Sequence, residues 1–258
     1  MWNRSAKGMR MPERDDQNDQ AECSPPEWLD AHEPHDAERC ARQRAGLREC
    51  LADRELHILE LGCGGGRIIK PLLEDAHAVI GMDRDDSVIR TLRSETAGTD
   101  PAPELVVGDF LNDPWPTHPR YRDQPFDAVL LLGNTLMTIT ELDAVIALFK
   151  RIAKSLRPGG RLLIDDLPQD LWPELTEGHW QSGISEDGTS QLVWAPDDSV
   201  FTLRIGEAVD PDRWTIDPDE TRYRLWTMSG LTLLARLAGL SDPEPDPGCA
   251  LIVLRRPE

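Results

Sequence analysis

Short apolar runs alternate with amphipathic segments between residues 56 and 167. The apolar runs are typical of buried strands and lie at 56–61, 76–83, 104–110, 126–134 and 161–167. The segments between them favour helices, which are predicted at 67–75, 85–95 and 141–160, the last with a Pro-Gly-Gly stop. Strands this apolar, separated by helices, indicate a parallel sheet covered on both faces.

The pattern changes after Leu167. Apolar and polar residues now alternate, as in half-exposed antiparallel strands, and strand-like segments lie at 191–209 (two strands joined by a Pro-Asp-Asp turn), 212–216 and 221–228. A helix capped by Ser229 and a last strand are predicted at 229–240 and 249–256. We therefore predict one α/β domain over 55–258, with an antiparallel insert at about 185–228.

The N-terminal part of the chain is predicted to stand outside this domain. Residues 1–23 are polar and charged, have little to bury, and are expected to form a disordered tail without the apolar middle of a signal peptide. Residues 24–54 predict a helical cap. Ser24 suits a helix N-cap, two prolines suit the first turn, and 35–50 is rich in helix formers.

Charge and cysteine content narrow the classes of partner. The chain has 28 Lys and Arg against 47 Asp and Glu, a net charge of −19, which repels nucleic acid and anionic membrane alike. The sequence contains no apolar run of 18 residues, so no membrane span is expected. Five cysteines without a Cys-x-x-Cys motif suggest neither a disulfide framework nor a metal cluster. Thiols in a reducing, cytoplasmic location are expected, with no bound metal.

The first apolar run leads directly into three glycines at alternate positions, Gly62, Gly64 and Gly66. Arg67 stands where the nicotinamide fingerprint requires a further glycine, and no Lys-Ser/Thr pair follows as in a triphosphate loop. Glu60, just before the turn, would hinder a pyrophosphate and help a ligand that carries an ammonium group. The turn therefore favours a ligand that lies on bare backbone and presents a cation.

Further polar residues follow the next strands in the same way. Asp83 ends the second predicted strand, where an acid accepts hydrogen bonds from both hydroxyls of a ribose. Asp109 and Phe110 end the third; the acid can accept from an exocyclic adenine amine and the ring can pack on the base. Gly133 and Asn134 follow the fourth, the place for a reacting group in a doubly wound sheet.

Together these motifs resemble the class I S-adenosylmethionine-dependent methyltransferase family over about Leu56–Leu167. "LELGCGGGR" resembles the first motif of the family, "GDF" its adenine motif and "RPGGRLLIDD" its fifth-strand signature. The resemblance implies a Rossmann-like, doubly wound seven-stranded sheet whose last strand runs antiparallel and whose sixth strand lies near 240–247. It implies S-adenosylmethionine as cofactor and S-adenosylhomocysteine as product. The cofactor residues expected are Glu60, Gly62, Cys63, Gly64, Gly66, Asp83, Arg84, Asp109, Phe110, Gly133 and Asn134.

The acceptor side is less defined. Methyl transfer requires that nucleophile, methyl and sulfur lie in line, and it needs a base only where the nucleophile must lose a proton. Candidate catalytic residues are Asn134, His179 and Asp166, although strand alternation turns only one of Asp165 and Asp166 towards the cleft. Five tryptophans follow the fifth strand (Trp172, Trp180, Trp194, Trp214 and Trp226) and form either an aromatic wall or the core of the insert. Candidate substrate contacts are Trp28, Trp172 and Trp226.

The sequence thus predicts a methyltransferase that acts on N or O of a small-molecule acceptor, as a monomer or homodimer. The acidity of the chain tilts the expectation towards an amine. The Asn-Pro-Pro-aromatic signature of nucleic-acid amino-methylases is missing after the fourth strand. Two alternatives stay open: a protein methyltransferase with the insert as partner surface, and a non-catalytic cofactor-binding or interaction protein on the same fold.

Overall fold

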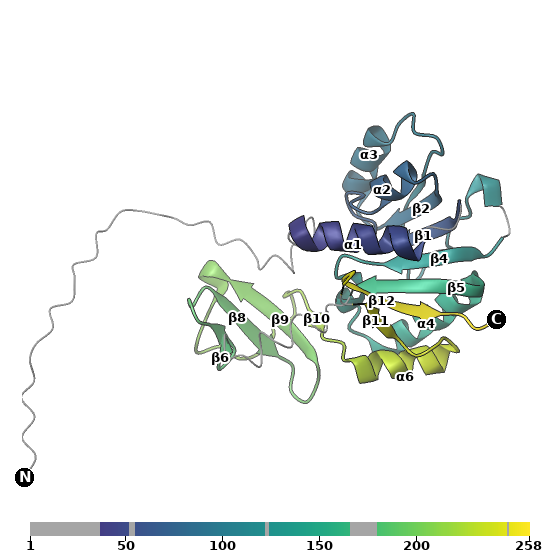
Figure 1. Cartoon of the computed structure of the whole chain (residues 1–258). Helices are drawn as coiled ribbons and strands as arrows, with labels where there is room; N and C mark the ends of the chain where they lie inside the picture. Colours follow the sequence, from purple (N-terminus) through teal and green to yellow (C-terminus); the bar gives the residue numbers. More distant parts are fainter. Residues whose placement is uncertain (1–36, 52–54, 122–123, 166–179, 247) are drawn as a thin grey trace, which may run out of the picture.

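The computed structural model describes residues 37–51, 55–121, 124–165, 180–246 and 248–258 (Figure 1). Its centre is a seven-stranded sheet in the order β11-β12-β5-β4-β1-β2-β3. The strands are β1 His57–Leu61, β2 Ala78–Asp83, β3 Glu104–Val107, β4 Phe126–Leu131, β5 Leu156–Asp165, β11 Glu244–Asp246 and β12 Leu251–Arg255. β12 runs antiparallel to β5 and to β11, while β1 to β5 are parallel. The predicted doubly wound sheet with an antiparallel last strand is confirmed.

Helices cover both faces of this sheet (Figure 1). The described helices are α1 Ala37–Cys50, α2 Ile69–Glu74, α3 Asp86–Glu95, α4 Leu142–Ser155 and α6 Met228–Ala238. One core layer joins α1, α2 and α3 to the sheet, with Leu47, Leu72 and Leu92 among its members. The other joins α4 and α6 through Phe149 and Leu231. Because both faces are covered, all five residues of β1 are buried, which explains the unbroken apolar runs in the sequence.

A second sheet is built from five antiparallel strands in the order β10-β9-β8-β7-β6. They are β6 Trp180–Gln181, β7 Ile184–Ser185, β8 Ser190–Trp194, β9 Val200–Ile205 and β10 Tyr223–Arg224. This sheet extends from one side of the main domain, as Figure 1 shows. Met137, in the short helix η3 Thr135–Thr138 that follows β4, packs in a cluster with Leu192, Phe201 and Leu225. The insert therefore touches the segment that carries the candidate site.

Three local predictions were wrong. The helix predicted over 141–160 ends at Ser155, because β5 begins at Leu156 and runs through the Pro-Gly-Gly sequence with a register shift against β4. Residues 212–216 form no strand; the carbonyls of Arg213 and Thr215 accept hydrogen bonds from the buried Arg204 instead. The cap of α6 is Thr227, whose hydroxyl accepts from the Gly230 amide at 3.0 Å. In the first two cases a tertiary contact overrode a local signal, and in the third a neighbouring residue supplies the cap.

The other elements agree with the sequence to within a few residues. β3 stops at Val107, so "GDF" lies just beyond the strand, and β11 supplies the sixth strand within the short segment where it was expected. η2 Pro119–Tyr121 and η4 Gly206–Ala208 complete the described elements. None of the described helices is long and apolar enough to cross a membrane. The helix expected from Ser24 lies outside the described residues.

Two buried histidines make the fold sensitive to acid. His57 stacks on Tyr121 with ring centroids 4.9 Å apart, and its Nε2 has no hydrogen-bond partner within the described parts of the chain. Nδ1 of His77 accepts from the Leu56 amide at 3.2 Å, which requires that nitrogen to be unprotonated. Burial lowers the pKa of both imidazoles.

We expect the contribution of these two histidines to the free energy of unfolding to fall as the pH drops below about 6.5, the ordinary pKa of histidine, because the unfolded chain then binds protons that the folded chain excludes. Urea unfolding at pH 7.5 and 5.5 measures this loss. A His57→Phe variant keeps the stacking on Tyr121 and should lose less stability between the two pH values than the wild type. An equal loss in both proteins would contradict the assignment to His57.

Candidate cofactor and acceptor site

A cleft of about 400 Å³ opens where the carboxyl ends of β1, β2, β3 and β4 meet. This is the edge of a doubly wound sheet at which ligands bind. Seven of the predicted cofactor residues line the cleft: Gly62, Gly64, Asp83, Arg84, Asp109, Phe110 and Gly133. Gly108, Leu111, Thr135, Thr138 and Ile139 complete the wall. The sequence motifs, scattered over 72 positions from residue 62 to residue 133, thus meet around one space.

The glycine turn has a structural reason at each alternate position. Gly62, Gly64 and Gly66 all have positive φ, at +73°, +48° and +77°. A Cβ on Gly62 would lie 2.7 Å from Oγ1 of Thr135, and one on Gly66 would lie 2.3 Å from a methyl group of Leu92. A Cβ on Gly64 would meet no protein atom within 4 Å. The outer glycines therefore let the turn pack, and Gly64 leaves bare backbone facing the cleft.

Glu60 is a buried acid with an unsatisfied oxygen. The residue is 3% exposed, and its Oε2 has no hydrogen-bond partner among the residues that the structure describes. Desolvation raises the pKa of this carboxyl to about 8; Arg67 opposes the shift, and the charges of Asp165 and Asp83 add to it. Glu60 is thus protonated at neutral pH in the free protein. A ligand ammonium group nearby would supply both a donor and a compensating charge, so Glu60 fits the amino-acid end of the family's cofactor.

Cys63 and Gly66 do not line the cleft, although both were predicted to bind the cofactor. Cys63 is 4% exposed, and its Sγ lies 3.0 Å from where a Cβ on Gly81 would be. Burial raises the pKa of the Cys63 thiol, which therefore stays protonated. Its side chain packs on the sheet, and any contact with a ligand is left to its backbone.

The carboxylate of Asp83 braces the glycine turn. Its Oδ2 accepts from the Gly64 amide at 2.9 Å and its Oδ1 from the Asp85 amide at 3.0 Å. Each carboxylate oxygen keeps a second lone pair. Asp83 lines the cleft, so these lone pairs are available to the two hydroxyls of a ribose, as predicted for this position.

We expect Asp83→Ala to lower the affinity for S-adenosylhomocysteine by at least about tenfold, since it removes two charge-assisted hydrogen bonds together with the brace on Gly64. Titration calorimetry of the variant against the wild type measures the change. Asp86→Ala, an exposed acid on α3, is the matched control with unchanged affinity. Wild-type affinity in Asp83→Ala would refute the placement of the ribose.

Asn134 occupies a strained and buried position beside the cleft. It has φ +63° and follows Gly133 at φ +70°, so two consecutive residues are left-handed. The Asn134 amide donates to Oδ2 of Asp165 at 2.9 Å, which holds the turn in place. The side chain is 7% exposed, yet both Oδ1 and Nδ2 are buried without a hydrogen-bond partner among the described residues. Such strain and such unsatisfied groups are typical of functional sites.

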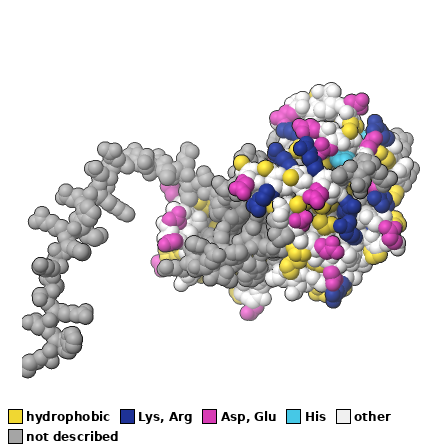
Figure 2. Space-filling model, viewed as in Figure 1, with side chains coloured by type: hydrophobic (Ala, Val, Ile, Leu, Met, Phe, Trp, Pro, Cys, Tyr) yellow, Lys and Arg dark blue, Asp and Glu magenta, His cyan; other side chains and the backbone are white. Residues whose placement is uncertain are grey.

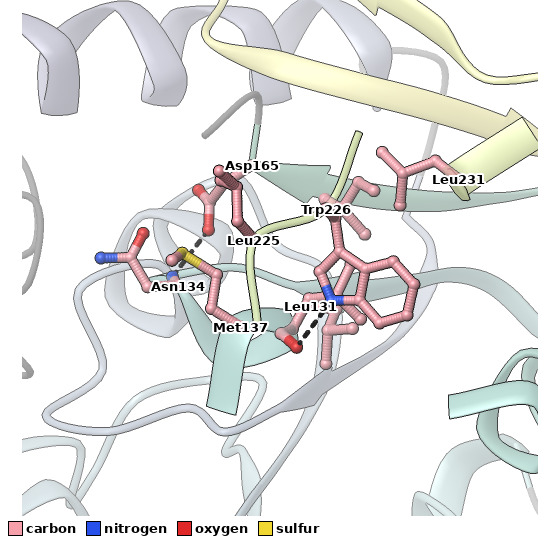
Figure 3. Close-up of a pocket in the computed structure, with 9 residues that line it drawn as sticks. Leu131, Asn134, Met137, Asp165, Leu225, Trp226 and Leu231 are labelled. Atoms are coloured by element: carbon pink, nitrogen blue, oxygen red, sulfur yellow. Dashed lines mark hydrogen bonds between the residues drawn. The ribbon is translucent and has the colours of Figure 1, made fainter. Parts of the chain in front are cut away.

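Asn134 and Asp165 also border a small apolar cavity of about 20 Å³ (Figure 3). Leu131, Leu136, Met137, Ile164, Leu225, Trp226 and Leu231 form its other walls. In Figure 3 the carboxamide of Asn134 points away from Trp226. The indole of Trp226 is 6% exposed and donates to the Leu136 carbonyl at 3.3 Å, and the ring is part of the core layer under α6. Trp226, a predicted substrate contact, therefore belongs to the core and borders this small cavity.

Gln43, on α1, was not predicted and lies at the centre of the site's polar network. It is fully buried; its Nε2 donates to Oδ1 of Asp165 and its Oε1 accepts from Arg67, both at 2.7 Å. Gln43 thereby joins the glycine turn to the residue that holds Asn134. The sequence carries no signal for this role, because a glutamine among charged residues of a helix looks like a surface residue.

The remaining predicted site residues, Trp28, Asp166, Trp172 and His179, lie outside the described residues. On the insert, Trp194, Phe201 and Tyr223 form an aromatic row, with centroids 4.9 Å apart between Trp194 and Phe201 and 5.8 Å between Phe201 and Tyr223. This row shares its cluster with Met137, next to the site. Phe201 is fully buried, and Trp194 and Tyr223 pack against its cluster, so for Trp194 the structure favours the second alternative from the sequence, the core of the insert.

The fold and the cleft define a Rossmann-like protein with a site for an adenosyl ligand that carries an ammonium group. Residues 58–160 match the model of the methyltransferase domain family. The predicted resemblance to the class I S-adenosylmethionine-dependent methyltransferases is confirmed over these residues, and S-adenosylmethionine is the cofactor that the similar proteins support.

Three proteins that are similar to this chain are methyltransferases. The chain is 32% identical over 108 residues to the cypemycin N-terminal methyltransferase of a Streptomyces species, a match that spans 42% of this chain and 40% of the relative. The CcbJ methyltransferase of Streptomyces caelestis superposes with a TM-score of 0.60 at 18% identity, covering 90% of this chain and 97% of that one. The 1,6-didemethyltoxoflavin-N1-methyltransferase of Burkholderia thailandensis gives a TM-score of 0.52 at 19% identity, over 86% and 80%.

Proposed function

We propose that the protein transfers the methyl group of S-adenosylmethionine to a nitrogen or oxygen of a small-molecule acceptor, with an amine as the preferred acceptor. The observation that carries this proposal is Asn134. Its buried carboxamide has no hydrogen-bond partner among the described residues, and the residues on either side of it, Gly133 and Thr135, line the cofactor cleft. A polar group so placed is satisfied by a second ligand beside the first.

The residues of the chain act by holding and orienting. S-adenosylmethionine supplies an electrophilic methyl group bound to a sulfonium sulfur. Oδ1 of Asn134 accepts a hydrogen bond from the acceptor N–H and turns the nitrogen lone pair towards the cleft. Asp165 fixes the Asn134 backbone, and Gln43 fixes Asp165. A basic amine that approaches as a cation must first lose a proton to solvent. The neutral amine then attacks the methyl group without a dedicated catalytic base, the bond from methyl to sulfur breaks, and the product is the methylated ammonium together with S-adenosylhomocysteine.

Charge supports a basic acceptor. The net charge of −19 favours the approach of cations. Figure 2 shows acidic and basic side chains interspersed over one face of the molecule. On that face, the attraction of cations therefore comes from the net charge and not from a patch of acidic residues. Two of the three similar proteins named above are N-methyltransferases, which agrees with a nitrogen acceptor.

A second candidate is methylation of a peptide or protein amino group. It is favoured by the similarity to an N-terminal methyltransferase. A cofactor-binding protein without transfer activity is the third outcome that an experiment must separate.

Incubation with methyl-labelled S-adenosylmethionine separates these outcomes. Small-molecule and macromolecular fractions of a cell extract are offered in parallel, with Asn134→Gly as the matched variant, because glycine keeps the left-handed backbone and removes only the carboxamide. Label in the small-molecule fraction with the wild type, strongly reduced with Asn134→Gly, supports the proposal. Label in macromolecules supports the second candidate. Binding without transfer in either fraction contradicts both.

A further inference from the structure

The loop after β3 forms one wall of the cleft and is tightly organised. Asp109, Phe110 and Leu111 line the cleft. The Asp109 carboxylate accepts from the Leu111 amide at 2.9 Å and from Nδ2 of Asn112 at 2.6 Å, and the Asp109 amide donates to Oδ2 of Asp113 at 2.8 Å. These bonds fix the shape of the loop but do not attach it to the rest of the domain.

Arg151 on α4 adds a polar attachment to the packing of Phe110, Leu111 and Trp115 on the core. Its Nη1 donates to the Phe110 carbonyl at 3.1 Å and its Nη2 to the Asp113 carbonyl at 2.7 Å. Its guanidinium also lies over the Trp115 ring, 4.1 Å from the centroid. Trp115 in turn donates from Nε1 to the Phe110 carbonyl at 2.8 Å. One side chain thus holds the loop at Phe110 and Asp113 and stacks on Trp115.

The contacts of Arg151 with the loop are not needed to pack α4 on the sheet. The buried residues of α4, Val145, Leu148, Phe149 and Ile152, already dock it on the sheet. Arg151 is partly buried, and desolvation lowers the pKa of its guanidinium while Asp113 opposes the shift. Only an arginine combines two parallel donors with a planar surface for stacking. A side chain that bears a desolvation cost and gives both arms to loop carbonyls determines where the loop stands.

We infer that Arg151 is a positioning residue that sets the selectivity of the cleft for a purine with an exocyclic amine, by holding Asp109 and Phe110 in place. This inference rests on the proposed function, because it takes the cleft to hold an adenosyl group. The free lone pairs of the Asp109 carboxylate accept from the amine. A 6-oxo purine presents a carbonyl lone pair to the same carboxylate and is disfavoured. When the clamp is released, the loop relaxes and this discrimination is lost.

The test is titration calorimetry with S-adenosylhomocysteine and S-inosylhomocysteine, which differ at that exocyclic group. We expect the wild type to prefer the adenosyl compound by at least about tenfold, the discrimination typical of one polar contact. Arg151→Met should weaken adenosyl binding about tenfold, affect inosyl binding less, and bring the preference below about threefold. Lys150→Met, an exposed neighbour on the same helix, is the matched control with wild-type values.

Arg151→Lys keeps the charge and one donor group, so its preference for the adenosyl compound should lie between those of the wild type and Arg151→Met. If Arg151→Met does not fold, Arg151→Lys is the variant that tests the inference. An unchanged preference in a folded Arg151 variant, or no preference in the wild type, overturns the inference while adenosyl binding upholds the cofactor site. Failure of the wild type to bind S-adenosylhomocysteine at all removes the proposed function and this inference with it. A general loss of structure would lower the affinities for both compounds equally, and the ratio of the two affinities would then stay at the wild-type value.

Discussion

Gly62→Ala is expected to lower the affinity for S-adenosylhomocysteine by at least about 100-fold. Alanine at φ +73° costs about 1–2 kcal/mol, and its Cβ would lie 2.7 Å from Oγ1 of Thr135. Thr135 cannot easily retreat, because its hydroxyl donates to the Leu132 carbonyl at 2.7 Å. With both effects the cost approaches about 3 kcal/mol, and each 1.4 kcal/mol is tenfold in affinity. The turn must shift into the cleft that it lines.

Gly65→Ala is the matched control for this prediction. A Cβ on Gly65 would meet no protein atom within 4 Å, its φ is not positive, and it does not line the cleft. We expect wild-type affinity for this variant in the same calorimetric titration. Equal affinities for the Gly62 and Gly65 variants would show that the turn does not carry the ligand.

Glu60 is expected to make cofactor binding release a proton. The pKa of its buried carboxyl is about 8 in the free protein, so Glu60 holds a proton below that pH. A ligand ammonium group favours the ionised carboxylate, and the proton leaves on binding. The affinity for S-adenosylhomocysteine should therefore rise about tenfold per pH unit from pH 6 towards 8. It should level off near pH 8, because above that pH Glu60 is already ionised in the free protein and no proton has to leave.

Calorimetry in two buffers of different ionisation enthalpy counts the proton directly. We expect about one proton released per ligand at pH 7 in the wild type and none in Glu60→Gln, whose affinity should be nearly independent of pH over the same range. The free protein follows the opposite trend. Because the folded-state pKa of Glu60 lies above the unfolded value, its contribution to stability declines as the pH rises from about 4.5 towards 8. A proton count of zero in the wild type would contradict the role given to Glu60.

The fold was predictable where burial alone determines the pattern. β1, β2 and β4 lie under helices on both faces, so they appear in the sequence as apolar runs. The glycine turn and Asp83 were predictable because ligand chemistry demands particular residue types next to strand ends. Where a tertiary contact decides the structure, the local pattern failed. Residues 212–216 alternate like a strand but supply carbonyls to the buried Arg204.

The site was predictable only in part, for a related reason. Gln43 and Arg151 act through hydrogen bonds to residues far away in the sequence, and nothing at their own positions announces those partners. Asn134 was predictable as a residue that follows a strand. Its left-handed backbone, and a carboxamide without a hydrogen-bond partner among the described residues, emerge only from the fold. Conversely, Cys63 has the sequence position of a ligand contact and a side chain that packs on the sheet. The position of a residue directly after a strand predicts that it lies at the carboxyl edge of the sheet. Three-dimensional packing then decides which of these side chains reach the ligand.

The most direct measurement is a calorimetric titration of the wild-type protein with S-adenosylhomocysteine at pH 7.5. We expect one binding site per chain with a dissociation constant in the micromolar range, ordinary for a metabolic ligand. The same titration should show weaker binding by Asp83→Ala and still weaker binding by Gly62→Ala, with Gly65→Ala unchanged. Absence of binding at about 1 mM ligand, or equal binding by all four proteins, would contradict the assignment of the cleft to S-adenosylmethionine.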